Sequence, residues 1–154
     1  MTTSSSRGVN EEVRSRFTVY PEMSLEEVQH YLLPQEDVIG SYVVENPETH
    51  KITDFISFFH IQSSVIDNKK YDTFTATYCY YYANTTTSLK DLLGDGIIAA
   101  KNEGGDVFNA LEVMNNATVF DDLKFARGDG TLHYYFYNWR LNPIKPSEMA
   151  VILP

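Results

Sequence analysis

The run Ile52–Ile61, ITDFISFFHI, most strongly constrains how this chain can fold. Successive residues of a β-strand point to opposite sides of its sheet. One side of this run would carry Ile56 and Phe58 and the other Phe55 and Phe59, so both sides hold bulky apolar groups. Such a strand is predicted to lie at the centre of a sheet that is covered on both faces.

A second β-rich run, Phe74–Ala83 (FTATYCYYYA), follows a polar loop. Alternation predicts two sides, with Tyr78, Tyr80 and Tyr82 on one and Cys79 and Tyr81 on the other. A tyrosine can bury its ring and still offer a hydroxyl, which suits a sheet core or a binding groove. The residues alone leave both interpretations open.

Two helices have clear start signals. Ser24 and Glu27 have the spacing of a capping box, which predicts a helix over Leu25–Leu32. Ser88 is predicted to cap a second helix, which ends near Glu103 where two glycines follow. The remaining elements are a helical turn from Asn116 or Thr118 to Leu123 and short strands over Val38–Glu45, Val107–Leu111, Leu132–Tyr137 and Ala150–Leu153.

The irregular alternation of strands and helices is typical of an α+β fold, in which helices pack against a mixed sheet. A length of 154 residues suits one domain with its own core. Residues 1–9 are rich in Thr and Ser and are expected to be a disordered tail. Residues 10–154 are expected to form the folded domain.

Composition excludes several classes of function. A net charge of -9 argues against a nucleic-acid partner, whose phosphates would be repelled. No stretch approaches the roughly 18 consecutive apolar residues of a transmembrane segment. The single cysteine, Cys79, excludes a disulfide framework and a thiolate metal cluster, so a reducing, cytoplasmic setting is the simplest expectation.

No self-contained catalytic set is present in the sequence. The four histidines lack metal-ligand spacing, so a structural role is favoured for each and no metal site is expected. Cys79 has no nearby histidine, which favours a buried structural thiol over a nucleophile. There is no P-loop, G-x-S-x-G or G-x-G-x-x-G motif.

The strongest candidate site is the stretch Lys124–Trp139, KFARGDGTLHYYFYNW. Gly128 and Gly130 flank Asp129, and glycines allow backbone conformations and close ligand approaches that other residues do not. The acid would then stand at the start of an aromatic strand buried on both faces. An ordinary β-turn with an aspartate capping its own backbone explains the same residues. Ser63, after the central strand, also has two interpretations: it could contact a ligand or simply start a turn.

KFARGDG resembles the K-F-G-x-G-D-G motif of the eukaryotic N-myristoyltransferases (glycylpeptide N-tetradecanoyltransferases). Further segments are similar to that family's C-terminal half and follow in the same order: MSLEEVQHYLLPQEDVI (Met23–Ile39), SYVVE, TDFISFF, DVFNAL (Asp106–Leu111), LKF (Leu123–Phe125) and YYFYNW (Tyr134–Trp139). The resemblance extends from about residue 17 to the end of the chain.

The resemblance implies an acetyltransferase-like (GNAT-type) mixed sheet, the second of two halves related by a pseudo-twofold axis. It implies transfer of myristoyl from myristoyl-CoA, a co-substrate and not a tightly bound cofactor, to the N-terminal glycine of proteins. The second half supplies much of the peptide groove, while the first holds the backbone oxyanion hole and most of the myristoyl-CoA site. The isolated chain is therefore expected to be inactive.

Two other functions are weighed against this one. The alternative is a non-catalytic peptide-binding fragment or degenerate module of the same fold. A stand-alone acetyl-type acyltransferase ranks last, because a pyrophosphate-binding loop that opens a helix is missing from the sequence.

The family's site residues carry over one at a time. The terminal carboxylate of Pro154 is implied as the general base that accepts a proton from the substrate's glycine. Peptide contacts are implied for Ser63, Tyr78, Gly128, Asp129, Gly130, Leu132 and Leu153, with Asp129 pairing with a Lys or Ser of the substrate. There are two departures: Ala126 replaces a family glycine, and Gln62 stands where many members have proline before the serine.

Overall fold

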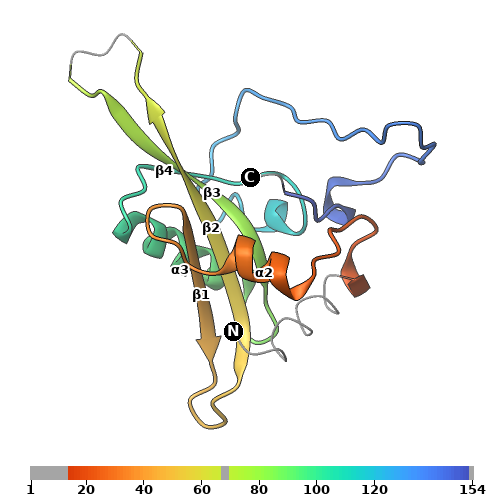
Figure 1. The fold of residues 1–154 in the computed structure, drawn as a ribbon, viewed down its shortest axis with the longest axis horizontal. Coiled ribbons are helices and arrows are strands. Elements are labelled where there is room, and N and C mark those ends of the chain that lie inside the picture. Colours follow the sequence, from red (N-terminus) through yellow and green to blue (C-terminus); the bar gives the residue numbers. More distant parts are fainter. Residues whose placement is uncertain (1–13, 67–69, 153–154) are drawn as a thin grey trace.

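A computed structural model describes residues 14–66 and 70–152. Within these ranges the strands form one sheet of order β1-β2-β3-β4 (Figure 1). The strands are β1 (Ile39–Glu45), β2 (Ile52–Ser64), β3 (Thr73–Ala83) and β4 (Val107–Asn109). The first three pair antiparallel and β4 joins β3 in parallel, so the sheet is mixed. The expected α+β fold is confirmed. The predicted tail, residues 1–9, and the site residues Leu153 and Pro154 lie outside the described residues.

Helices cover both faces of this sheet. Helix α2 (Leu25–Leu32) crosses one face and α3 (Leu89–Asn102) the other, and the 3-10 turns η1 (Asn116–Thr118) and η2 (Pro146–Glu148) follow (Figure 1). The predicted capping box is confirmed: Ser24 Oγ accepts from the Glu27 N–H at 3.2 Å, and the Glu27 carboxylate accepts from the Ser24 N–H at 2.8 Å. None of the helices in the described part of the chain is long and apolar enough to cross a membrane.

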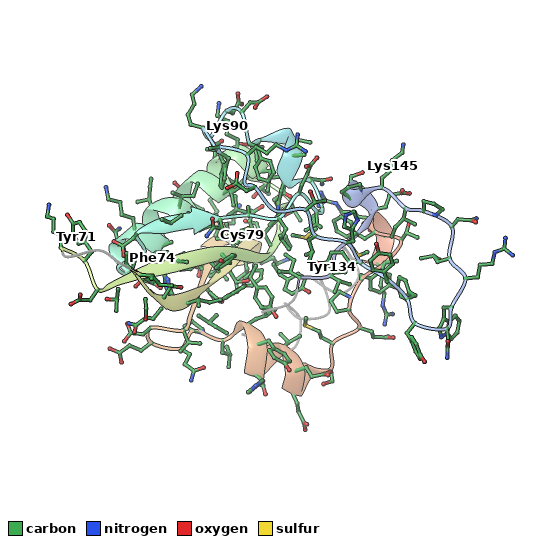
Figure 2. All side chains as sticks on the ribbon, turned by 90° about the horizontal axis from the view of Figure 1, so that it is seen from above. Tyr71, Phe74, Cys79, Lys90, Tyr134 and Lys145 are labelled. Carbon is green, nitrogen blue, oxygen red and sulfur yellow. The ribbon has the colours of Figure 1, made fainter. Side chains whose placement is uncertain are left out.

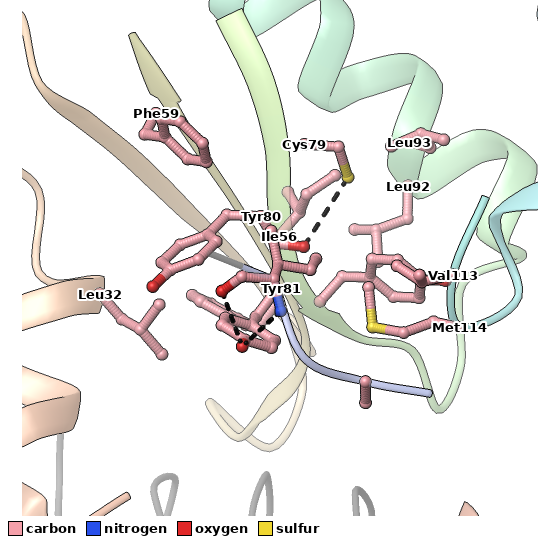
Figure 3. Packing of buried hydrophobic residues seen from close by; sticks show 14 of the residues in the cluster. Leu32, Ile56, Phe59, Cys79, Tyr80, Tyr81, Leu92, Leu93, Val113 and Met114 are labelled. Carbon is pink, nitrogen blue, oxygen red and sulfur yellow. Dashed lines mark hydrogen bonds between the residues drawn. The ribbon is translucent and has the colours of Figure 1, made fainter. Parts of the chain in front are cut away.

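The central position predicted for Ile52–Ile61 is confirmed. Strand β2 lies between β1 and β3, and both of its faces are buried, with Phe58 at 0% and Phe59 at 7% exposure. Phe59 belongs to the main apolar cluster, which gathers residues from both helices and from β3 (Figure 3). Burial on both sides is the reason that this run carries almost no polar face.

A β-bulge changes the predicted sides of β3. The register passes from Phe58↔Cys79 to Ile56↔Tyr82, so Tyr80 and Tyr81 both lie opposite the single residue Ser57. The Ser57 hydroxyl donates to the Tyr81 carbonyl at 2.8 Å and accepts from its N–H at 3.1 Å, which satisfies the bulged backbone. The prediction that Tyr80 and Tyr81 point to opposite sides was therefore wrong: their ring centroids are 4.5 Å apart.

The predicted strand over Leu132–Tyr137 is absent. These residues lie in a long loop that runs out from the sheet between η1 and η2 (Figure 1), with Tyr135 at 87% and Tyr137 at 88% exposure. The prediction of a strand buried on both faces was wrong because aromatic residues favour a strand only where a partner strand and a packed surface exist. Within the described residues this run has no partner strand, and only its first part packs against the core, through Tyr134.

The predicted strand over Ala150–Leu153 is also not formed in its described part. Met149 makes one isolated parallel bridge to Val19, and residues 150–152 pair with no strand. The predicted strand over Val107–Leu111 is shorter, since β4 ends at Asn109.

One buried carboxylate organises the loop between β3 and α3. Asp54 is 1% exposed. Its Oδ1 accepts from the N–H groups of three successive residues, Thr85, Thr86 and Thr87, at 2.6–3.1 Å. Its Oδ2 accepts from the hydroxyls of Thr53, Thr86 and Thr87 at 2.5–3.0 Å. The loop's conformation thus depends on Asp54.

Two glycines of α3 are expected to respond in opposite directions to alanine. A Cβ on Gly96 would lie 2.5 Å from Cδ1 of the buried Ile56, so Gly96→Ala should destabilise the fold by about 1–3 kcal/mol. A Cβ on Gly94 would meet nothing closer than 3.7 Å, so Gly94→Ala should stabilise it by about 0.5–1 kcal/mol through helix propensity. Urea unfolding of both variants checks this, and equal effects would contradict the packing of α3.

Candidate functional site

An apolar cavity of about 250 Å³ lies on the side of the sheet opposite α3. It is lined by Phe59, Ile61, Tyr78, Cys79, Leu111, Leu132, Tyr134 and Ile152. Phe59 and Tyr78 are partners across β2 and β3, and their rings stack with centroids 5.3 Å apart. Cys79 and Tyr134, both labelled in Figure 2, come from β3 and from the long loop. With Leu111 and Ile152, the cavity therefore joins five separate parts of the chain.

Two of the predicted site residues meet in this cavity. Tyr78 contributes from β3 and Leu132 from the long loop. Ile152 lines the same cavity and is the residue before the predicted contact Leu153. An apolar side chain of a ligand held there would lie next to Ile152.

Ser63 lies beyond the cavity and not in its wall. It is two residues after Ile61, on the same face of β2, and is partly exposed. Strand β2 runs to Ser64, three residues past the predicted end, so Ser63 is in a strand and not in a loop. Gln62 has the backbone N–H that proline lacks and pairs with Thr75. Gln62 in place of the family's proline therefore does not loosen the chain before Ser63, because both residues pair within the sheet.

Gly128, Asp129 and Gly130 lie in the exposed loop, with a bend at Asp129. A Cβ on either glycine would meet nothing within 4 Å, and neither glycine has a positive φ. Within the chain, neither a positive φ nor a neighbouring atom requires glycine at these two positions, and the close approach of a ligand stays a prediction. Ala126 likewise has no positive φ, so the departure from the family glycine causes no strain. A contact from Asp129 to substrate stays a prediction.

The segment before the C-terminus is held by hydrogen bonds from four different parts of the chain. The Met149 carbonyl accepts from the Met114 N–H at 2.9 Å, and the Ala150 N–H donates to the Val19 carbonyl at 2.8 Å. The other bonds come from two tyrosines. The Tyr134 hydroxyl donates to the Val151 carbonyl at 2.8 Å. The Tyr81 hydroxyl accepts from the Ile152 N–H at 3.1 Å and lies 3.3 Å from the Ile152 carbonyl oxygen, to which it donates.

These contacts explain why residues 150–152 form no strand. The Ala150 N–H, the Val151 carbonyl and both main-chain groups of Ile152 bind side chains or an isolated main-chain group and not a neighbouring strand. Ala150 is 0% and Ile152 is 5% exposed, so the segment is buried as a strand would be. Buried backbone groups need such partners because unpaired ones are costly.

Burial keeps the reactive side chains of this region protonated. It raises the pKa of Tyr81 to about 12 against the opposing hydrogen bond with Ile152, so the hydroxyl is neutral and can both donate and accept. Burial also raises the pKa of Cys79 to about 12, and the thiol is 2% exposed. The prediction of a structural Cys79 is confirmed.

His60 lies on the α3 side of β2 and belongs to a separate buried network. Its Nδ1 is 2.8 Å from the Thr77 hydroxyl and its Nε2 is 3.2 Å from a carboxylate oxygen of Glu103. Both ring nitrogens have partners, as expected for a structural histidine. No group of three or more His, Cys, Asp or Glu side chains that could hold a metal ion occurs within residues 14–66 and 70–152.

Sequence reasoning missed most of the cavity wall and both tyrosines that hold the C-terminal segment. In the sequence, Tyr134 stands out only as part of an aromatic motif, and alternation alone places Tyr81 on the wrong side of β3. The one available signal was the row of tyrosines in Phe74–Ala83, which indicated buried hydroxyls that need partners. It did not indicate which hydroxyl reaches which partner, because that depends on the bulge opposite Ser57.

Comparison with known proteins identifies the family. Residues 5–151 match the family described as Myristoyl-CoA:protein N-myristoyltransferase, C-terminal domain. Glycylpeptide N-tetradecanoyltransferase 1 of Arabidopsis thaliana is 48% identical over 140 residues, which are 90% of this chain and 32% of that protein. The Plasmodium falciparum glycylpeptide N-tetradecanoyltransferase is 43% identical over 145 residues, 94% of this chain and 35% of that protein.

A solved structure agrees with the sequence comparison. Saccharomyces cerevisiae N-myristoyltransferase with bound myristoyl-CoA matches with a TM-score of 0.74 and 33% identity, over 84% of this chain and 37% of that one. The chain thus spans about a third of the length of the relatives that it matches. It belongs to the N-myristoyltransferase family, of which it contains the C-terminal domain.

Proposed function

We propose that this chain is the peptide-binding part of an enzyme that transfers myristoyl from myristoyl-CoA to the N-terminal glycine of proteins, in the cytoplasm. One observation carries the proposal: the cavity brings Tyr78 and Leu132 together with Ile152, two residues before the predicted base Pro154. Substrate binding and proton removal would then occur side by side.

The chemistry requires a base at this point. An α-ammonium group, with a pKa of about 8, must lose a proton before its nitrogen can attack a thioester. The Pro154 carboxylate accepts this proton, the nitrogen adds to the myristoyl carbonyl, and the C–S bond breaks to release CoA. The donors for the oxyanion come from the family's first half. This chain therefore binds the peptide and supplies the base.

The cavity and its surroundings indicate which peptides would bind. An apolar volume of about 250 Å³ suits one small or medium side chain near the substrate's N-terminus. The exposed carboxylate of Asp129 is three residues before Leu132, where it can meet a Lys or Ser further along the substrate. A chain with a net charge of -9 also favours the approach of basic peptides.

The isolated chain is expected to bind a glycine-starting peptide but not to transfer myristoyl. Oxyanion donors lower the barrier by on the order of 3 kcal/mol or more, and the family's donors lie outside this sequence. A radiolabelled myristoyl transfer assay tests the chain alone. It also tests a chimera in which the chain is fused to the C-terminal end of the N-terminal two thirds of the Arabidopsis relative. Normal turnover by the chain alone would contradict the first expectation, and a folded but silent chimera would contradict the proposed function.

Leu132→Asn is expected to weaken peptide binding about tenfold, because the cavity loses apolar wall worth about 1.4 kcal/mol. Ile98→Asn is the matched control: Ile98 is 59% exposed and Leu132 is 58% exposed, but Ile98 lies on α3, at the opposite face of the sheet. Fluorescence titration with a labelled glycine-starting peptide measures both. Equal affinities of the two variants would show that the cavity is not the peptide site.

A second candidate function is a peptide-binding module without catalysis, and the observation that favours it is the chain's coverage of only about a third of its relatives. In that case Asp129→Ala weakens peptide binding, blocking the Pro154 carboxylate costs little, and the chimera stays silent.

A further inference from the structure

Strand β2 continues beyond its partner β1, so part of its edge is open. Its pairing with β3 extends to Ser64, and these two strands project together past the rest of the sheet (Figure 1). On the other side, the register with β1 begins only at Ile39, and the His60 N–H donates to the carbonyl of Val38 at 2.8 Å. Within the described residues, the part of β2 after His60 has no neighbouring strand on the β1 side.

A tight turn keeps the preceding chain away from this edge. Gln35 and Ile39 exchange two main-chain hydrogen bonds, both 2.9 Å long, and Asp37 between them has a positive φ of 59°. The chain before β1 therefore folds back onto the outer side of β1 and does not continue alongside β2.

Hydrogen bonds on either side of Gln62 and Ser64 determine where their main-chain groups point. The His60 N–H points to the β1 side, as its bond to the Val38 carbonyl shows. The Val65 N–H points to the opposite side, where it donates to a carbonyl at the start of the hairpin's return, at 2.9 Å. Because main-chain groups alternate in direction along a strand, those of Gln62 and Ser64 point to the open edge.

The residue opposite Gln62 agrees with this direction. Thr75 faces Gln62 in the register, yet its N–H donates to the Asp106 carboxylate and its carbonyl accepts from the Asp106 N–H, both at 2.9 Å. Both groups thus point away from β2, as at a non-hydrogen-bonded position of an antiparallel pair. Gln62 and Ser64 are exposed, and no hydrogen bond from residues 14–66 and 70–152 reaches their outward N–H and carbonyl groups.

An extended peptide is the ligand that such an edge fits. A peptide added as a strand gains affinity from main-chain hydrogen bonds, and its alternate side chains are read separately. Main-chain groups are the same in every sequence. This kind of binding therefore suits an enzyme whose protein substrates share an N-terminal glycine and differ beyond it.

The open edge is continuous with the candidate site. Ile61, the residue before Gln62, lines the cavity and is 42% exposed. Ser63, a predicted peptide contact, has its side chain on the same face of β2. In a strand added at this edge, a residue opposite Ile61 or Ser63 would turn its side chain to that face as well. Binding at Gln62 and Ser64 would thus direct alternate substrate side chains to the cavity side of the sheet.

We propose that the main-chain groups of Gln62 and Ser64 bind the substrate peptide as an added β-strand. The proposal rests on the proposed function, in which a glycine-starting peptide is the substrate, and it states how the peptide is held beyond its glycine. Gln62 is one of the two departures from the family pattern. Its N–H is therefore a donor that members with proline at this position lack.

Amide hydrogen exchange in the 154-residue chain tests the proposal directly. A saturating glycine-starting peptide should slow exchange of the Gln62 and Ser64 amides about tenfold or more, because each N–H gains an acceptor. Val43 is the matched control: it is 45% exposed on the edge strand β1, and its main-chain groups point outward like those of Ile39, four residues earlier. Its exchange should not change. A bound peptide that leaves Gln62 and Ser64 unprotected, or protects Val43 equally, would overturn the proposal.

Gln62→Pro removes the outward N–H and breaks no hydrogen bond between β2 and β3, since proline is tolerated where the N–H faces an open edge. The Kd for the peptide should rise about tenfold. Gln62→Ala keeps the N–H, and Val43→Pro removes an outward N–H far from the cavity, so both should stay within twofold of the parent. Equal affinities of Gln62→Pro and Gln62→Ala would contradict the proposal. A dimer of the parent chain that Gln62→Pro dissociates in sedimentation would assign the edge to a second copy and would also overturn it.

A peptide series keeps the proposal falsifiable if Gln62→Pro does not fold. Each amide of the glycine-starting peptide is replaced in turn by an ester, which removes one N–H. Binding to the parent chain should weaken at alternate positions, because only every second residue of an added strand faces the edge. Losses without this alternation would overturn the proposal.

These experiments also separate the two levels of inference. If the parent chain binds no glycine-starting peptide, the proposed function is wrong, and the edge proposal is wrong with it. If Leu132→Asn weakens binding while Gln62→Pro does not, the cavity remains the peptide site and only the edge proposal is wrong.

Discussion

Conversion of the Pro154 carboxylate to a carboxamide is expected to lower kcat of the chimeric enzyme by about two to four orders of magnitude, the usual contribution of a positioned general base. The carboxamide keeps the length and shape of the chain but cannot accept the ammonium proton at neutral pH. The peptide KM should change little, because the cavity wall of Tyr78, Leu132 and Ile152 is untouched. Protein ligation of a synthetic C-terminal peptide gives both forms for a steady-state assay.

The control is the same ligation with the free acid. A single glycine added after Pro154 gives an independent check, because it keeps a carboxylate but moves it by about 3.5 Å, and kcat should again fall. A glycine added before Met1 should have no effect. Full turnover by the carboxamide would rule out the terminus as the base, and proton removal would then have to be assigned to another group.

Asp54→Ala is expected to destabilise the fold by about 3–5 kcal/mol, because it leaves a set of buried donors without an acceptor. Three N–H groups and three hydroxyls converge on this carboxylate. Asp54→Asn keeps the shape and one acceptor oxygen, so a smaller loss of about 1–3 kcal/mol is expected. Urea unfolding measures both variants. Asp95→Asn, on the exposed side of α3, is the control and should stay within about 0.5 kcal/mol of the parent.

The same carboxylate predicts a dependence of stability on pH. Burial alone would raise the pKa of Asp54, but the hydrogen bonds from Thr86, Thr53 and Thr87 outweigh it and hold the pKa well below its ordinary value. A group whose pKa is lower in the folded state stabilises the fold above its unfolded pKa, about 4. This stability is lost as the pH falls below that value. The parent should therefore approach Asp54→Asn in unfolding free energy between pH 5 and pH 2, and a constant difference would contradict the assignment.

Elements set by local chemistry were predicted well from the sequence. The capping box from Ser24 to Glu27 spans only four residues and determines where α2 begins. Ser88 determines the start of α3 in the same local way. Bulk on both sides of Ile52–Ile61 required a central strand, and β2 is central. These predictions succeeded because the partner groups are neighbours in sequence or because the whole environment of a residue is apolar.

Elements that depend on distant partners were not predicted. The run Leu132–Tyr137 has strand-forming residues but finds no partner strand in the described chain, and Tyr135 and Tyr137 remain exposed. The bulge at Tyr80 and Tyr81 depends on how Ser57 of β2 pairs with β3. Side-chain alternation within one strand does not reveal this pairing. The site was predicted in part for the same reason: Tyr78 and Leu132 meet in the cavity, but Ile61, Leu111 and Ile152 join it only through the tertiary fold.

The hydroxyls of Tyr81 and Tyr134 bind carbonyl and amide groups, which every residue possesses, and not the side chains of Val151 and Ile152. These hydrogen bonds are therefore independent of which side chains stand at positions 151 and 152.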